Sequence, residues 1–169
     1  NSELSHTLKN VKFLSDEQLR DNQFQAIGVT SIIRGEGCTA ISINLALSLA
    51  TTGKRTLLID GDVHSADLSK RLGLGAPSGP AEQVAANSAD LDQYVKVDQA
   101  TGLHVLPLAA LRTAKTPDWP EHLSAFIADA RNRYDYAIFD LPPVTMLNDI
   151  RTAAKFIDGF VVVIKWGEV

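Results

Sequence analysis

A glycine-rich turn between a strand pattern and a helix pattern is the feature that most constrains how this chain can fold. Residues 31–39 read Ser-Ile-Ile-Arg-Gly-Glu-Gly-Cys-Thr. The apolar run at 26–31 is typical of a buried parallel strand, and residues 39–50 form a helical pattern that ends at Gly53. A strand, a glycine turn and a helix in this order predict a loop whose backbone N–H groups face a phosphate.

The turn carries a cysteine where a phosphate-binding loop of this kind has a lysine. That lysine meets the β- and γ-phosphates of a nucleotide, and preorganised charge of this type is usually the largest contribution to catalysis. Its replacement by Cys38 should cost about 3 kcal/mol or more, which is about a hundredfold in rate. The Arg34 guanidinium is long enough to reach a phosphate, but it leaves from a different part of the loop.

Cys38 allows three interpretations, of which we favour a small, neutral side chain that fills the space of the lost lysine. A thiol at a helix N-terminus can instead have a lowered pKa, which suits redox sensing or metal binding. The chain has no second cysteine to resolve a sulfenate, and Cys38 with His64 makes too few ligands for a zinc site. An engineered substitution is the third interpretation. The single cysteine also excludes an internal disulfide and fits a reducing cytosol.

Three carboxylates lie where predicted strands end: Asp60 and Asp62 follow one strand, and Asp140 ends another. Open parallel sheets bind ligands at this edge, so we expect the three side chains to converge. Converging carboxylates repel one another unless a cation lies among them, and magnesium bound to a phosphate ester is the usual one. Thr39 adds a hydroxyl at the start of the helix. The pattern predicts a magnesium site made by Thr39, Asp60 and Asp140.

Strand and helix patterns alternate along the 169 residues, which predicts one α/β domain over residues 1–169. We expect a mostly parallel, doubly wound sheet with helices on both faces, and an N-terminal helix at about 3–14 before the first strand. Strand patterns fall at 26–31, 55–60, 103–107, 136–140 and 160–165, and the other helical patterns at 39–50 and 121–133.

The charge pattern argues against nucleic acid as a partner. The net charge is −4, and no run of lysine and arginine or interleaving of basic and aromatic residues occurs in the sequence. The chain begins with Asn1 in place of methionine, which we interpret as a sign of an excised piece of a longer protein or of a processed tag.

Three segments together resemble one known family. Residues 29–46 contain the glycine turn and Asn-Leu-Ala, 57–62 read Leu-Leu-Ile-Asp-Gly-Asp, and 134–144 contain Phe-Asp-Leu-Pro-Pro. In this order they look like the Walker A, Walker A-prime and Walker B motifs of bacterial tyrosine kinases, the domains of polysaccharide co-polymerases related to the MinD/ParA ATPases. The resemblance covers about residues 3–167. It implies a P-loop NTPase fold that binds ATP or ADP with Mg²⁺.

The sequence departs from this family at functional positions. Cys38 replaces the loop lysine, Arg34 replaces a proline, and His64 replaces a basic residue that is usually arginine. The family's oligomerisation motif Glu-x-x-Arg-x-x-Arg reads Glu-x-x-His-x-x-Lys here, with His6 and Lys9 at the arginine positions. We therefore expect weak or absent ATP turnover, which would make the chain a pseudokinase.

The resemblance assigns roles to individual residues. The preferred hypothesis is a degenerate kinase-like domain that regulates exopolysaccharide or capsule polymerisation and export. It would lie in the cytoplasm at the inner face of the cell membrane, bound to a membrane-spanning co-polymerase segment or subunit and capable of homo-oligomerisation. The alternative is an active kinase or ATPase in which Arg34 replaces the lysine and Asp60 or Asp62 is the catalytic base; a positioning ATPase of the MinD/ParA type is a third hypothesis. The expected nucleotide-binding residues are Arg34, Gly35, Glu36, Gly37, Cys38, Thr39 and Ala40.

Overall fold

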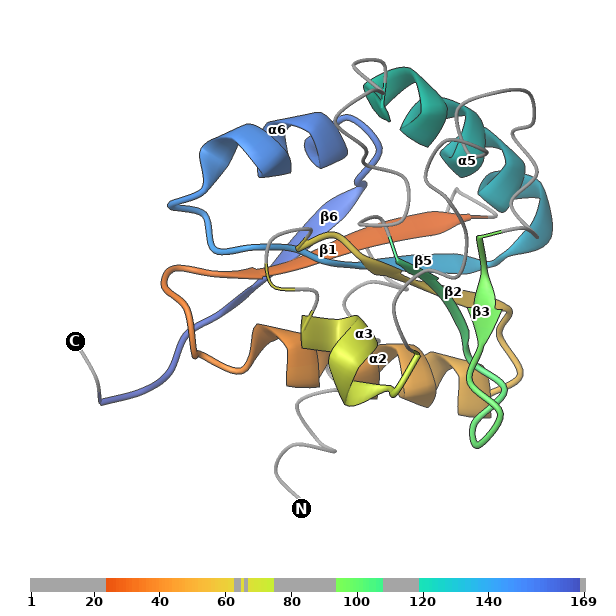
Figure 1. Cartoon of the computed structure of the whole chain (residues 1–169), viewed down its shortest axis with the longest axis horizontal. Helices are drawn as coiled ribbons and strands as arrows, with labels where there is room; N and C mark the ends of the chain where they lie inside the picture. Colours follow the sequence, from red (N-terminus) through yellow and green to blue (C-terminus); the bar gives the residue numbers. More distant parts are fainter. Residues whose placement is uncertain (1–23, 63–64, 66, 75–93, 108–118, 168–169) are drawn as a thin grey trace.

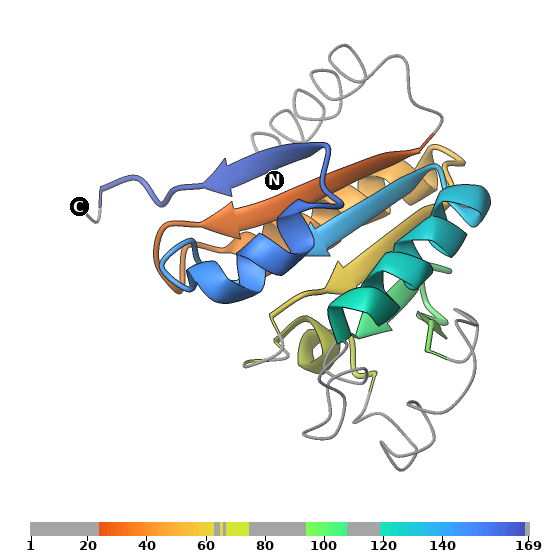
Figure 2. The ribbon, with the colours of Figure 1, turned by 90° about the horizontal axis from the view of Figure 1, so that it is seen from above.

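The computed structural model describes residues 24–62, 65, 67–74, 94–107 and 119–167. Within these ranges the protein is a six-stranded sheet in the order β3-β4-β2-β5-β1-β6. Helices α2 and α3 lie on one face of the sheet and α5 and α6 on the other, as Figures 1 and 2 show. The elements are β1 (Gln25–Ser31), α2 (Cys38–Thr51), β2 (Thr56–Asp60), α3 (Asp67–Arg71), β3 (Lys96–Val97), β4 (His104–Pro107), α5 (Trp119–Arg133), β5 (Tyr136–Asp140), α6 (Leu147–Ala154) and β6 (Gly159–Val163).

Every strand pair is parallel except β3 with β4, which is antiparallel. The parallel pairing brings the carboxyl ends of the strands to one edge of the sheet. In the register of β2 with β5, Asp60 lies directly beside Asp140. The sheet therefore places two of the three predicted carboxylates next to each other.

The central strands are buried on both faces, which is why their sequences are continuous apolar runs. Successive side chains of a strand point to opposite faces. Leu57 and Ile59 accordingly belong to the core cluster that includes α5, whereas Leu58 belongs to the cluster that includes α2. Phe139 is fully buried among the α5-side residues. Each helical layer thus seals one face of the sheet.

The five predicted strands are confirmed, each with ends within two residues of the expected ones. The elements α3, β3 and α6 were not predicted, because they have five, two and eight residues and carry little periodic signal. The predicted N-terminal helix at about 3–14 lies outside the described residues, as do His6, Lys9 and His64.

Among the described residues, no helix combines the length and the apolar character needed to cross a membrane.

Gly61 follows β2 and packs directly against the end of β5. Its backbone N–H donates to the carbonyl oxygen of Asp140 at 2.8 Å. A Cβ atom at this position would lie 2.8 Å from that same oxygen and 3.2 Å from Leu141 Cδ2. Since a backbone carbonyl cannot swing aside as a side chain does, a side chain at position 61 must push the two strand ends apart.

We expect Gly61→Ala to lower the free energy of unfolding by about 1 to 3 kcal/mol, because the added methyl group overpacks a junction of two backbones. Urea denaturation measures this change. Gly159→Ala is the matched control, since nothing lies within 4 Å of a Cβ at that strand residue. The control should stay within about 0.5 kcal/mol of the parent chain. Equal effects of the two substitutions would contradict the prediction.

Candidate functional site

The loop between β1 and α2 owes its shape to two glycines. Gly35 has φ 90° and Gly37 has φ 91°, a left-handed conformation that L side chains rarely adopt. Gly37 is also the N-cap residue of α2 and uses no side chain to cap it. The free N–H groups of the first helical turn therefore stay available to an anion. The glycine turn is confirmed as a strand-to-helix loop.

Glu36 braces this loop from outside. Its Oε2 accepts the backbone N–H of Ile33 at 3.0 Å and that of Ile32 at 2.8 Å. Its Oε1 accepts the backbone N–H of Lys165 at 3.1 Å. The bond from Ile33 is the largest of the causes that lower the pKa of the Glu36 carboxyl. Glu36, predicted to bind nucleotide, is not among the residues that line the cavity described next, and its observed contacts are those of a loop brace.

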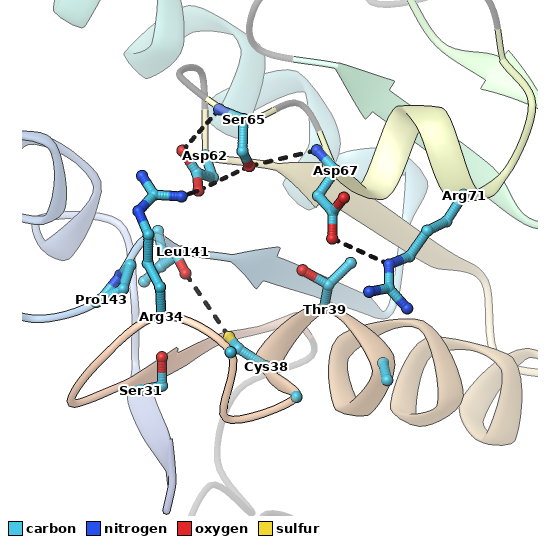
Figure 3. A pocket seen from close by; sticks show the side chains of 13 residues that line it. Ser31, Arg34, Cys38, Thr39, Asp62, Ser65, Asp67, Arg71, Leu141 and Pro143 are labelled. Atoms are coloured by element: carbon cyan, nitrogen blue, oxygen red, sulfur yellow. Dashed lines mark hydrogen bonds and ion pairs between the residues drawn. The ribbon is translucent and has the colours of Figure 1, made fainter.

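A cavity of about 340 Å³ opens above the loop at the carboxyl edge of the sheet (Figure 3). The loop and the first turn of α2 form its floor, and the segment after β2 together with α3 forms the facing wall. Most of the predicted nucleotide-binding residues thus meet around one hollow, and α3 adds residues that sequence reasoning missed. The lining residues are Ser31, Arg34, Gly35, Gly37, Cys38, Thr39, Ala40, Asp62, Ser65, Asp67, Arg71, Leu141 and Pro143.

The Cys38 thiol turns toward the strand ends. Its Sγ lies 3.2 Å from the carbonyl oxygen of Val29, 3.4 Å from Asp140 Oδ1 and 3.6 Å from the carbonyl oxygen of Leu141. Burial is the main cause that raises the pKa of this thiol far above its ordinary value, and the negative charge of Asp140 adds to it. This direction argues against the alternative interpretation of a thiol with a lowered pKa and agrees with the favoured one of a neutral side chain, because burial and the carboxylate outweigh the helix N-terminus. Cys38 is a neutral hydrogen-bond donor.

Asp140 is almost completely buried, with 2% of its surface exposed. The Ser42 hydroxyl donates to its Oδ1 at 2.9 Å, and the Cys38 thiol and the Thr39 hydroxyl also bond to this carboxyl. Burial raises the pKa of Asp140 to about 6, although these three donors oppose the shift. The charge of Asp60 contributes to the same rise.

Asp60 is buried beside it and is anchored to α3. Its Oδ2 accepts the backbone N–H of Ser69 at 3.1 Å and the Ser69 hydroxyl at 2.6 Å. Its other oxygen, Oδ1, is buried and finds no hydrogen-bond partner among the described residues. Burial is the leading cause that raises the pKa of the Asp60 carboxyl. An orphaned oxygen on a buried acid leaves room for a cation or for water.

The donor set fits magnesium shared with a phosphate better than a metal centre of protein ligands alone. In the described part of the chain no three histidine, cysteine, aspartate or glutamate side chains group closely enough to hold a metal ion. The Thr39 hydroxyl, the Asp140 carboxyl and the free oxygen of Asp60 are oxygen donors at one strand edge. Magnesium prefers such oxygens and completes its shell with water and phosphate.

Two arginines reach the cavity, and each is paired with a carboxylate. Arg34 Nη1 lies 3.4 Å from Asp62 Oδ2, and Arg34 Nη2 lies 3.2 Å from the sulfur of Met146. Arg71 Nε lies 3.0 Å from Asp67 Oδ2 on the same short helix. Asp62 is further occupied by the Ser65 hydroxyl at 2.8 Å. The predicted base Asp62 is therefore engaged by Arg34 and by both the hydroxyl and the backbone N–H of Ser65, and Arg34 is held by an acid.

The fold and the loop define a class of protein through the solved structures that resemble this one. The VpsO kinase domain is 29% identical with a TM-score of 0.69, over 95% of this chain and 79% of that chain. The septum site-determining protein MinD of Pyrococcus horikoshii OT3, solved with Mg-ADP, reaches a TM-score of 0.64 at 23% identity, over 83% and 57% of the two chains. At that identity it shows the fold alone. The fold is that of a P-loop NTPase.

Sequence relatives narrow this class to a family. The AAA domain family matches residues 25–166. Tyrosine-protein kinase YwqD of Bacillus subtilis (strain 168) is 31% identical over 176 residues, 99% of this chain and 70% of that protein. The chain belongs to the AAA domain family and is homologous to the bacterial tyrosine kinases. The succinoglycan biosynthesis transport protein ExoP of Rhizobium meliloti (strain 1021) is 30% identical over 170 residues, and this chain spans 98% of its own length but only 22% of ExoP.

The buried thiol yields a first prediction for the site. We expect iodoacetamide at about pH 8 to alkylate Cys38 at least about tenfold more slowly in the native protein than in the urea-unfolded chain. The reason is that the raised pKa leaves little thiolate in the native protein. Mass spectrometry of timed samples measures both rates. Native alkylation as fast as that of the unfolded chain would show a reactive thiolate instead.

The raised pKa of Asp140 predicts a pH-dependent penalty on stability. The folded protein holds a proton on this acid up to about pH 6, whereas the unfolded chain releases it near the ordinary value of 3.8. The folded state therefore binds more protons between these values, and the free energy of unfolding falls as the pH rises through this window and levels off above it. We expect Asp140→Asn to be more stable than the parent by up to about 3 kcal/mol at about pH 8.

The advantage of Asp140→Asn should shrink toward zero as the pH falls below the ordinary value of 3.8 to about 3, where the parent carboxyl is protonated in both states. Urea denaturation at several pH values measures the difference between the two proteins. A difference that does not change with pH would show that Asp140 titrates normally in the folded protein.

Proposed function

We propose that this chain is a degenerate kinase-like domain, a pseudokinase with weak or absent ATP turnover, that regulates the polymerisation and export of exopolysaccharide or capsule. The observation that carries the proposal is the state of position 38. The loop keeps both left-handed glycines and the open start of α2. At the lysine position, however, a neutral thiol turns toward Val29 and Asp140.

The loss of the lysine charge should lower catalytic turnover more than it lowers the affinity for nucleotide. Backbone N–H groups at a helix start attract phosphate without any side chain. The lysine instead neutralises the charge that builds up on the transferred phosphoryl group. Its removal costs about 3 kcal/mol or more of transition-state stabilisation.

ATP or ADP with Mg²⁺ is the ligand that this site would take. Thr39, Asp60 and Asp140 would hold the magnesium ion, which would supply positive charge against the phosphates. Gly35, Gly37 and the first residues of α2 would face the phosphates. The solved complex of MinD with Mg-ADP, which shares this fold, supports the assignment of ligand.

The second candidate is an active tyrosine kinase or ATPase in which Arg34 stands in for the lysine. It is favoured by the position of Arg34, which lines the cavity with 52% of its side-chain surface exposed. Asp60 or Asp62 would then be the base for an incoming tyrosine hydroxyl. Against it, Arg34 pairs with Asp62, and Asp60 is 1% exposed and anchored to Ser69. Neither acid is free to meet a substrate in this arrangement.

The location of the domain in the cell and its partners are also proposals. We infer from the kinship with ExoP, a transport protein of succinoglycan biosynthesis, that the domain acts in the cytoplasm at the inner face of the cell membrane. Its partner there would be a membrane-spanning co-polymerase segment or subunit, and copies of the domain could assemble with one another. A single P-loop domain over residues 1–169 is the proposed unit.

Restoring the lysine tests the function directly. We expect isothermal titration calorimetry to show weak binding of Mg·ATP and Mg·ADP by the parent, and binding at least about tenfold tighter by Cys38→Lys, because an ammonium group on phosphate makes charge-assisted hydrogen bonds. A phosphate-release assay should show turnover near background for the parent.

Cys38→Ala is the matched control, because it removes the thiol without adding charge and should bind as the parent does. Tight binding with rapid phosphate release by the parent would contradict the proposal and support an active enzyme in which Arg34 replaces the lysine. An absence of binding in every variant would mean that the site has lost more than its lysine.

A further inference from the structure

The wall of the cavity that faces the glycine loop is made by the short helix α3. Asp67 and Arg71 from this helix line the cavity, and Figure 3 shows the Arg71 guanidinium extending from α3 toward Thr39. Among the lining residues, Arg34 and Arg71 carry the only positive charges. Their guanidinium groups come from opposite sides of the hollow, one from the loop and the other from α3.

Asp60 fixes the position of α3 relative to the loop. Its Oδ2 binds both the backbone N–H and the hydroxyl of Ser69, in the middle of the helix. Asp60 itself ends β2 in register with Asp140, beside the start of α2. Arg71 lies two residues beyond Ser69, so its guanidinium is placed by the same buried acid that ends the central strand.

Arg71 is held by an exposed ion pair through Nε, and this contact leaves its other N–H donors for a ligand. Its Nε pairs with Asp67 Oδ2 at 3.0 Å, in an i,i+4 pair whose side chains are 56% and 48% exposed. Such exposed pairs contribute little, so a multiply charged anion can compete for the arginine. A guanidinium group carries five N–H donors in a planar fork that matches phosphate oxygens, and the contact through Nε uses one of them.

The charges around the cavity balance when no ligand is bound. Arg34 faces Asp62 and Arg71 faces Asp67, so each cation is matched by one carboxylate. Among the described residues that line the hollow, a phosphate chain would meet no unpaired cation unless the arginines turn from their carboxylates toward it. This charge balance agrees with the weak binding proposed above, and it identifies Arg34 and Arg71 as the groups that can bind a phosphate.

We propose that Arg71 contacts the phosphates of a nucleoside di- or triphosphate in this cavity, together with Arg34, and thereby supplies from α3 part of the charge that the loop lacks. The proposal rests on the nucleotide site of the proposed function and deepens it. Asp67 holds Arg71 in the ligand-free state and releases it to the phosphate. Arg71 is thus a phosphate-binding residue that the sequence motifs do not contain.

Calorimetric titration of the full chain with ATP and with pyrophosphate, with and without Mg²⁺, tests this role. Arg71→Ala should raise the Kd for both ligands about fivefold to twentyfold, because it removes a charge-assisted contact to phosphate. The Kd should also depend less steeply on salt concentration than in the parent. Arg71→Lys should retain part of the affinity, since it keeps the charge but loses the planar fork.

Lys54→Ala is the matched control. It removes one positive charge from an exposed lysine that precedes β2, at the opposite edge of the sheet, where it lines a second cavity of about 440 Å³. It should leave the Kd within about a factor of two, because screening weakens so distant a charge. Equal effects of Arg71→Ala and Lys54→Ala would overturn the proposal, as would a parent protein that binds neither ATP nor pyrophosphate.

A double-mutant cycle with Asp67→Asn separates contact from general repulsion. We expect Asp67→Asn to tighten ATP binding in the parent background, because it frees Arg71 and removes a negative charge from the wall. The gain should be at least about threefold smaller in the Arg71→Ala background. Equal gains in both backgrounds would show that Asp67 acts by repulsion alone and would overturn its role as the holder of Arg71.

The two proposals fail separately. Rapid phosphate release by the parent would refute weak turnover and leave the effect of Arg71→Ala on the Kd intact. A parent that binds no nucleotide would refute the role of Arg71 and remain compatible with absent turnover. Circular dichroism of each variant confirms that the exposed substitution at position 71 leaves the fold unchanged.

Discussion

The packing of two acids side by side at the ends of β2 and β5 is the constraint on which the rest of this site depends. Asp60 and Asp140 face each other in the register of parallel strands and are almost completely buried. Burial is the main cause that raises the pKa of both carboxyls, and the charge of Asp60 adds to the rise at Asp140. A core that served stability alone would gain from apolar residues at these positions. We interpret the two buried acids as part of a site for a cation that binds together with an anionic ligand.

Each part of the cavity is attached to one of these two acids. Asp140 accepts hydrogen bonds from Ser42, Cys38 and Thr39, which fix the first turn of α2 and with it the end of the glycine loop. Asp60 accepts two from Ser69 and so fixes α3. Floor and wall are therefore held to neighbouring strand ends, and their separation follows from the spacing of the sheet.

The sequence was sufficient to predict the parallel sheet, the glycine loop and the acids at the strand ends, because these depend on local patterns and on the rule that parallel strands end at one edge. It was not sufficient for Arg71, which lies in a five-residue helix whose place is set by the bond between Ser69 and Asp60. The assignment of Glu36 to the ligand stays a prediction, and in the structure its carboxylate accepts backbone N–H groups of its own loop. The position of Arg71 and the contacts of the Glu36 carboxylate depend on neighbours that come together only when the chain folds.

The neutral residue at position 38 has two consequences that reinforce each other. A lysine ammonium there would attract phosphate, and by its charge it would also hold the pKa of Asp140 down. The thiol does neither: it donates a hydrogen bond toward Asp140 and is itself kept protonated by that acid and by burial. Among the described lining residues the positive charge belongs to Arg34 and Arg71, and each of them faces a carboxylate. Phosphate binding in such a cavity requires the displacement of ion pairs, so affinity depends on how weakly the carboxylates hold the arginines.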